Sequence, residues 1–119
     1  MDSMDSTEAI AALAALAQST RLETFRILVE REPDGLAAGE IARLLSIPQN
    51  TMSAHLAVLT RAGLVDGERR SRSIIYRANL VRLSDLTRFL VRDCCGGRPE
   101  LCAALFADLM PCCREDARR

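Results

Sequence analysis

The chain has 119 residues, of which 49% are hydrophobic, and its 16 basic residues, all arginine, balance 16 acidic ones. This length is enough for one domain with a modest core. The charge is uneven: residues 1–40 hold three arginines against eight acids, residues 41–92 nine against three, and the remainder four against five. We therefore expect the middle of the chain to meet a polyanion such as DNA. The 3% aromatic content disfavours a protein that stacks single-stranded bases.

The first thirty residues do not resemble a targeting signal. Asp2, Asp5 and Glu8 precede the apolar run Ala9 to Ala17, which is too short to span a bilayer. We expect a cytoplasmic protein with no membrane partner. In that reducing compartment, the five cysteines are expected to be metal ligands or reactive thiols rather than a disulfide framework.

Two helices are expected before residue 38. Ala9 to Ala17 is rich in good helix formers, with Ile10, Leu13 and Leu16 on one side. Thr20 to Glu23 has the pattern of a capping box and is expected to open the second helix. Its inward-facing residues are expected to be Leu22, Phe25, Leu28 and Val29. The turn formers from Glu32 to Gly35 end it.

Residues 38–62 have the pattern of a helix-turn-helix, with a first helix over 38–45 and a turn at Ser46 to Pro48. In the second helix Met52, Leu56 and Leu59 form an apolar stripe, and Gly63 ends it. The opposite side carries small and polar residues, which fit a major groove. The expected DNA contacts in this segment are Gln49, Asn50, Thr51, Ser53, Ala54, His55 and Arg61.

Residues 64–78 are expected to form a β-hairpin, the wing, with strands at 64–70 and 73–78. Arg69, Arg70 and Arg72 cluster at its tip. A charged hairpin end can simply be solvated, but behind an expected recognition helix these arginines are expected to contact phosphate or the minor groove. A helix over 80–93, with Leu83, Leu86 and Leu90 in a stripe, and a last helix from Pro99 to Met110 follow.

The segment Thr51-Met52-Ser53-Ala54-His55-Leu56, followed by Leu59 and by Ala62 to Val65, is similar to the T-x-S-x-H-L…L…A-G-L-V pattern of the ArsR/SmtB family of winged-helix metalloregulators. The resemblance implies a mainly α fold with a small β-hairpin, a winged helix-turn-helix with dimerisation helices at both ends. Helices 9–17 and 80–93 would then build a homodimer. It also implies a repressor that binds double-stranded operator DNA and leaves it when a metal or metalloid binds.

All five cysteines, Cys94, Cys95, Cys102, Cys112 and Cys113, lie within residues 94–113. Cys94, Cys95 and Cys102 could meet across the turn at Gly96 to Pro99 and offer three thiolates, which suit a soft ion. They resemble the C-terminal site of some arsenic-responsive family members, which implies As(III) or Sb(III) as inducer and no organic cofactor. The better-known arsenic site of the family is a C-x-C pair on the helix-turn-helix, and residues 36–40 here lack cysteine. Cys112 and Cys113 are interpreted as part of a tail.

Two alternatives remain open. A repressor of the same fold could sense oxidants or persulfides, and a Cys95–Cys102 disulfide would be less strained than one between adjacent cysteines. A more distant alternative is an enzyme similar to arsenate reductases or phosphatases, because Cys112 to Arg118 satisfies C-x5-R. The residues between them include Glu115 and Asp116, which do not suit an oxyanion-binding loop. We therefore expect no enzymatic activity.

Overall fold

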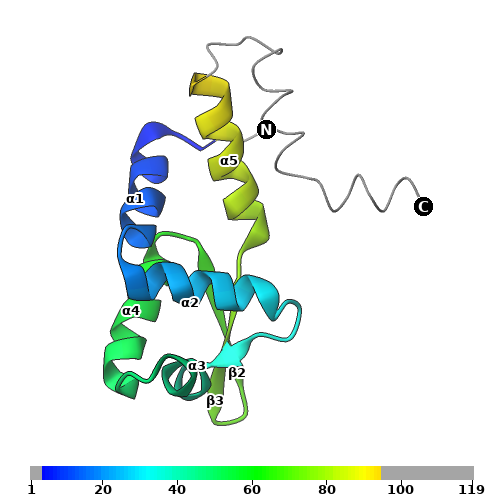
Figure 1. Cartoon of the computed structure of the whole chain (residues 1–119). Coiled ribbons are helices and arrows are strands. Elements are labelled where there is room, and N and C mark those ends of the chain that lie inside the picture. Colours follow the sequence, from blue (N-terminus) through cyan, green and yellow to red (C-terminus); the bar gives the residue numbers. More distant parts are fainter. Residues whose placement is uncertain (1–3, 95–119) are drawn as a thin grey trace, which may run out of the picture. The chain divides into compact units, whose positions relative to one another are not determined.

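A computed structural model describes the backbone of residues 4–94 and the side chains of residues 4–91. The described part contains five helices and a small three-stranded sheet (Figure 1). The chain divides into two compact units, with the boundary after Leu86. The elements are α1 (Ser6–Leu16), α2 (Ser19–Glu30), β1 (Leu36–Ala37), α3 (Ala38–Leu45), α4 (Gln49–Arg61), β2 (Val65–Arg70), β3 (Ser73–Ala78) and α5 (Leu80–Cys94).

The first helix, α1, begins at a capping box. The Asp5 carboxylate accepts from the Glu8 N–H at 2.8 Å, and the Glu8 carboxylate accepts from the Asp5 N–H at 3.1 Å. The buried side of the helix consists of the small residues Ala9, Ala12 and Ala15. Its larger apolar residues point elsewhere, since Ile10 is 65% exposed and Leu13 is 41% exposed. The alanines therefore allow close packing on the buried side of α1, while the larger side chains of Ile10 and Leu13 lie at the surface.

The start of α2 corrects two sequence-based expectations. The N-cap is Gln18, whose side-chain oxygen accepts from the Arg21 N–H at 2.8 Å, so Thr20 lies inside the helix and the expected capping box is wrong. Leu22 was expected to face inward, but it is 43% exposed. Shifting the helix start leaves Thr24, Phe25 and Leu28 on the buried side. The Thr24 hydroxyl is satisfied there by donating to the Thr20 carbonyl at 2.8 Å.

The helix-turn-helix has the expected boundaries. The first helix, α3, ends at Leu45. The next residue, Ser46, has a positive φ of 58°, and the Ile47 N–H donates to the Ala42 carbonyl at 3.0 Å. The second helix, α4, buries Met52, Leu56 and Leu59 completely. It ends in a Schellman motif around Gly63, with the Leu64 N–H bonded to the Leu59 carbonyl at 3.0 Å.

The wing is an antiparallel hairpin with a third strand that the sequence did not reveal. The strand order is β1-β3-β2, and β1 pairs with β3 through Leu36 opposite Tyr76 and Ala37 opposite Ile75. In β2 and β3, Val65 faces Ala78 at the base and Arg70 faces Ser73 near the tip. Figure 1 shows the hairpin extending past α3. Strand β1, which follows the turn after α2, thus attaches the base of the wing to the helical body.

The last described helix, α5, begins after Asn79, whose side chain accepts from the Arg82 N–H at 3.0 Å. Within the first unit, Leu86 of the apolar stripe is buried and Leu83 is half-buried, and the expected role of this helix in dimerisation stays a prediction. The expected helix over residues 99–110 lies outside the described residues. None of the helices in residues 4–94 combines the length and the apolar character needed to cross a membrane.

Candidate nucleic-acid interface

The outer side of α4 carries the small and polar residues singled out from the sequence. Because the buried stripe of α4 faces the core, these residues face solvent on the opposite side of the helix. His55 is half-buried at the edge of this face, as expected of a flanking residue. The exposed residues are Gln49, Asn50, Thr51, Ser53, Ala54 and Arg61. The face offers hydrogen-bonding groups without bulky side chains, which a major groove can accept.

The N-terminal end of α4 is held against α3. Gly39 of α3 leaves room for the Gln49 side chain, because a Cβ on Gly39 would come within 3.3 Å of the Gln49 Oε1. Pro48 precedes the helix and provides no side-chain cap. Within the first turn of α4, the Asn50 side chain accepts from the Thr51 N–H at 3.0 Å.

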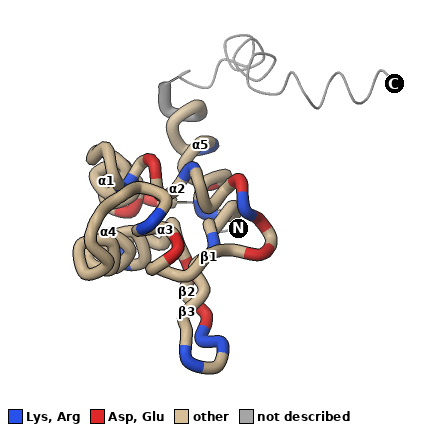
Figure 2. The backbone as a smooth tube through the Cα atoms, turned by 60° about the horizontal axis from the view of Figure 1, so that its bottom comes forward, with Lys and Arg blue, Asp and Glu red and all other residues tan. Residues whose placement is uncertain are grey.

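The arginines of the wing occupy its tip. Arg69, Arg70 and Arg72 are all exposed, and Figure 2 shows basic residues gathered at the end of the β2–β3 hairpin. Ser71 makes the tight turn with a φ of 57°. Arg70 also pairs with Glu68, with 3.4 Å between its Nη2 and the Glu68 Oε1. The hairpin thus presents positive charge on a projecting element, together with one carboxylate close to it.

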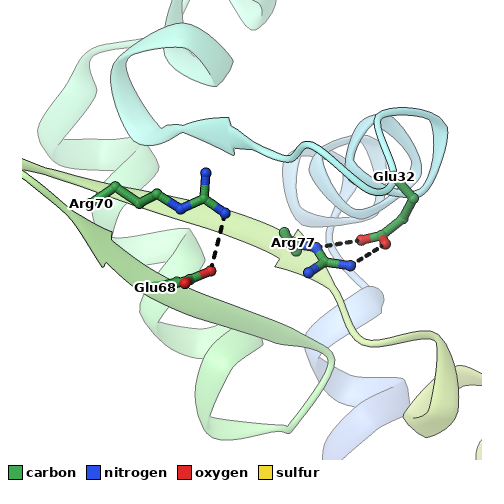
Figure 3. A network of polar contacts seen from close by, with 4 residues as sticks. All are labelled: Glu32, Glu68, Arg70 and Arg77. Carbon is green, nitrogen blue, oxygen red and sulfur yellow. Dashed lines mark hydrogen bonds and ion pairs between the residues drawn. The ribbon is translucent and has the colours of Figure 1, made fainter.

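The base of the wing contains an ion pair that joins it to the end of α2. Arg77 on β3 donates to both carboxylate oxygens of Glu32, at 2.8 Å from Nη2 and 3.4 Å from Nε (Figure 3). This hydrogen bonding and the negative charge of Glu32 raise the pKa of Arg77 above its ordinary value. Sequence reasoning missed the pair because 45 residues separate its members. Arg77 is therefore engaged in holding the wing.

Comparison with known proteins identifies the family of the chain. A helix-turn-helix domain model matches residues 16–68. The transcriptional activator HlyU of Vibrio cholerae serotype O1 is 30% identical over 91 residues, which are 76% of this chain and 82% of HlyU. An ArsR-like transcriptional regulator from Rhodococcus sp. RHA1 superposes with a TM-score of 0.67 at 28% identity, over 87% of this chain and 93% of that one. The chain belongs to the ArsR/SmtB family.

Two further solved structures resemble this family member in fold. Reduced HlyU from Vibrio cholerae N16961 has a TM-score of 0.58 at 30% identity and covers 73% of this chain and 88% of its own. A possible transcriptional regulator for arsenical resistance has a TM-score of 0.60 at 28% identity, over 67% of this chain and 80% of that one. The winged helix-turn-helix fold expected from the sequence is therefore confirmed.

The expected metal ligands of this ArsR/SmtB-family chain fall at and beyond the end of the described part. Cys94 is the last residue of α5, and its side chain is not described; Cys95 and Cys102 lie outside the described residues. Within the described residues, no three His, Cys, Asp or Glu side chains are grouped so that they could hold a metal ion. The cysteine set remains a prediction from the sequence.

Arg82 positions the other end of the candidate recognition helix. Its Nε donates to the Ala62 carbonyl at 3.3 Å, and its Nη1 lies 3.8 Å from a carboxylate oxygen of Glu8. The side chain passes so close to Gly63 that a Cβ there would lie 2.8 Å from the Arg82 Nε. One side chain from the start of α5 thus contacts both α1 and the end of α4 in this family member.

Proposed function

We propose that the chain is a repressor that binds double-stranded operator DNA through α4 and the wing. The observation that carries this proposal is the division of α4 between a fully buried apolar stripe and an exposed small, polar face. The projecting β2–β3 hairpin ends in three exposed arginines. The helix would read base edges in the major groove, while the arginines would contact the backbone.

The proposed binding species is a homodimer. Ile10 and Leu13 are large apolar residues left exposed on α1, a helix that the family resemblance assigns to dimerisation. Covering them with a second copy would remove apolar surface from water. A two-fold dimer would also place two copies of α4 about 34 Å apart, one turn of DNA, and would match a palindromic operator.

The proposed inducer is As(III) or Sb(III), bound by Cys94, Cys95 and Cys102. Three thiolates without a carboxylate or imidazole suit a thiophilic ion that takes three sulfur ligands. One structural relative is a possible transcriptional regulator for arsenical resistance, which supports an arsenical as the inducer. Binding would draw the end of α5 toward the segment that follows and shift the dimer to a form that fits the operator poorly. Couplings between such sites are typically about 1–3 kcal/mol.

An arsenite titration of the protein–DNA complex tests this proposal. The full chain is bound under reducing conditions to a fluorescent fragment from upstream of its own gene, and arsenite, zinc and a mild oxidant are added in separate experiments. We expect release near one equivalent of arsenite per subunit and no release by zinc. Absence of binding to the fragment would contradict the repressor assignment itself.

Cysteine variants test the ligand set. Cys102→Ser is expected to abolish the arsenite response and leave DNA affinity unchanged, because serine replaces the thiol without a large change in volume. The matched control replaces both Cys112 and Cys113 with serine, and this variant should respond as the wild type does. Full arsenite response in Cys102→Ser would show that the ligand set is wrong.

A thiol-based redox sensor is the second candidate function. One of the solved structures that resemble this chain is that of HlyU in its reduced form. In this chain Cys95 and Cys102 are the pair expected to form a disulfide, because adjacent cysteines form one only with strain. Release by the oxidant alone, reversed by a dithiol and lost in Cys102→Ser, would favour this candidate over arsenite sensing.

A further inference from the structure

The two faces of the wing carry different chemistry. Side chains alternate across a β-strand, so the register divides the hairpin into two sets. Gly67 and Arg69 share one face with Ile74 and Tyr76, and the Tyr76 ring and the Ile74 side chain fill the space beside Gly67. The other face, called the charged face below, carries Asp66, Glu68, Arg70 and Arg77. Asp66 lies opposite Arg77 near the base, and Arg70 lies near the tip.

The three tip arginines are therefore not equivalent. Arg70 lies two residues from Glu68 on the charged face, and the Nη2–Oε1 distance is 3.4 Å (Figure 3). Both side chains are largely exposed, at 56% and 60%, so the ion pair is weak, and a phosphate that reaches Arg70 competes with Glu68 for it. Within the described part of the chain, Arg69 and Arg72 have no such ion pair.

A cavity lies at the base of the charged face. This open hollow of about 390 Å³ is lined in part by Glu32, Asp66 and Glu68, with Arg77 as its basic residue. Arg77 is already bonded to Glu32, and Arg70 is the arginine that forms an ion pair with Glu68.

We propose that Glu68 limits the affinity of the wing for DNA by withholding Arg70 from phosphate. The inference rests on the proposed DNA-binding function and deepens it. Arg69 and Arg72 then supply the wing's phosphate contacts, and Arg70 contributes only when the Glu68 carboxylate is replaced. Glu68 is a positioning residue, since it acts through Arg70.

The test is the salt dependence of binding by Glu68→Gln. Dissociation constants are measured for the upstream fragment and for an unrelated duplex over a range of salt concentrations. We expect Glu68→Gln to bind both about three- to tenfold more tightly near 0.1 M salt, with a slope of log K against log salt steeper by about one unit. A melting curve for each variant checks that it is folded.

Arginine variants identify the side chain through which Glu68 acts. In the wild-type background, Arg69→Gln should flatten the slope by about one unit, and Arg70→Gln should change it by less than half of that. In the Glu68→Gln background, Arg70→Gln should remove the whole gain. A loss of about one unit for Arg70→Gln in the wild type would overturn the inference, because Arg70 would already contact phosphate.

Asp66→Asn is the matched control, since it removes the same charge from the same face nearer to the base of β2. It should leave the slope unchanged. An equal gain from Asp66→Asn and Glu68→Gln would overturn the inference in favour of a general field effect. Failure of the wild type to bind any duplex would overturn the proposed function and this inference with it, whereas wild-type binding with no effect of Glu68→Gln would overturn the inference alone.

Discussion

Two glycines show how a single residue fixes the fold, and alanine substitutions test them. Gly35 has a φ of 75°, and a Cβ there would lie 2.5 Å from the Tyr76 carbonyl oxygen, which is backbone and cannot yield. We expect Gly35→Ala to lower the unfolding free energy by about 3 kcal/mol. Gly63, with a φ of 82°, meets only the Arg82 side chain, so Gly63→Ala should cost about 1–2 kcal/mol.

Denaturant unfolding at one fixed protein concentration measures these changes. Gly39→Ala is the control, because Gly39 lies in α3 and its added Cβ would meet a flexible glutamine. That variant should be neutral or slightly stabilised. A smaller loss for Gly35→Ala than for Gly63→Ala would contradict the assigned backbone contact.

The same residues show what the sequence could and could not predict. Gly63 follows an apolar stripe of helical period, and this local signal was enough to end α4 correctly. The constraint on Gly35 arises from Tyr76, and that on Glu32 from Arg77, both more than forty residues along the chain. Such contacts depend on the path of the chain in three dimensions, and no local sequence pattern predicts them.

At the scale of elements, the wing is expected to depend on its anchor as well as on its tip. Glu32→Gln removes the negative charge that holds Arg77 while keeping the size of the side chain. We expect faster amide hydrogen exchange in β1 and β3, because opening the base of the hairpin costs less when the ion pair is lost. DNA affinity should fall, and the slope of log K against log salt should stay unchanged, because neither Glu32 nor Arg77 is proposed to contact phosphate.

Glu23→Gln is the matched control, since Glu23 is an exposed carboxylate on α2 away from the turn. It should leave both exchange and binding unchanged. Faster exchange confined to α2 in Glu32→Gln, with β3 unaffected, would show that the ion pair stabilises the helix end rather than the wing.

Element boundaries followed the strength of the local signal. The helix-turn-helix and the hairpin were predicted closely, because period-3.6 and period-2 patterns end there at glycine or turn residues. The two-residue strand β1 was missed because it is too short to show a period and exists only by pairing with β3. The start of α2 was misplaced because Gln18 caps it, although Thr20 and Glu23 match a capping box.

At the scale of the whole molecule, the exposed apolar residues of α1 give the dimer proposal a direct test. Ile10→Glu places a charge on a side chain that is 65% exposed in the single chain, so the monomer fold should tolerate it. If that residue is covered by a second copy, two charges are buried in each dimer and two apolar contacts are lost. We expect the dimer dissociation constant to rise by about a hundredfold or more.

Sedimentation equilibrium measures that constant, and Leu44→Glu is the control because Leu44 is 52% exposed on α3, within the helix-turn-helix. The control should dimerise as the wild type does. A monomeric Ile10→Glu variant should lose operator binding even though every residue proposed to contact DNA is intact, since one copy would cover only half of a palindromic site. Undiminished dimerisation of Ile10→Glu would mean that α1 does not form the interface, and the spacing of the two recognition helices would then have to be set by another surface.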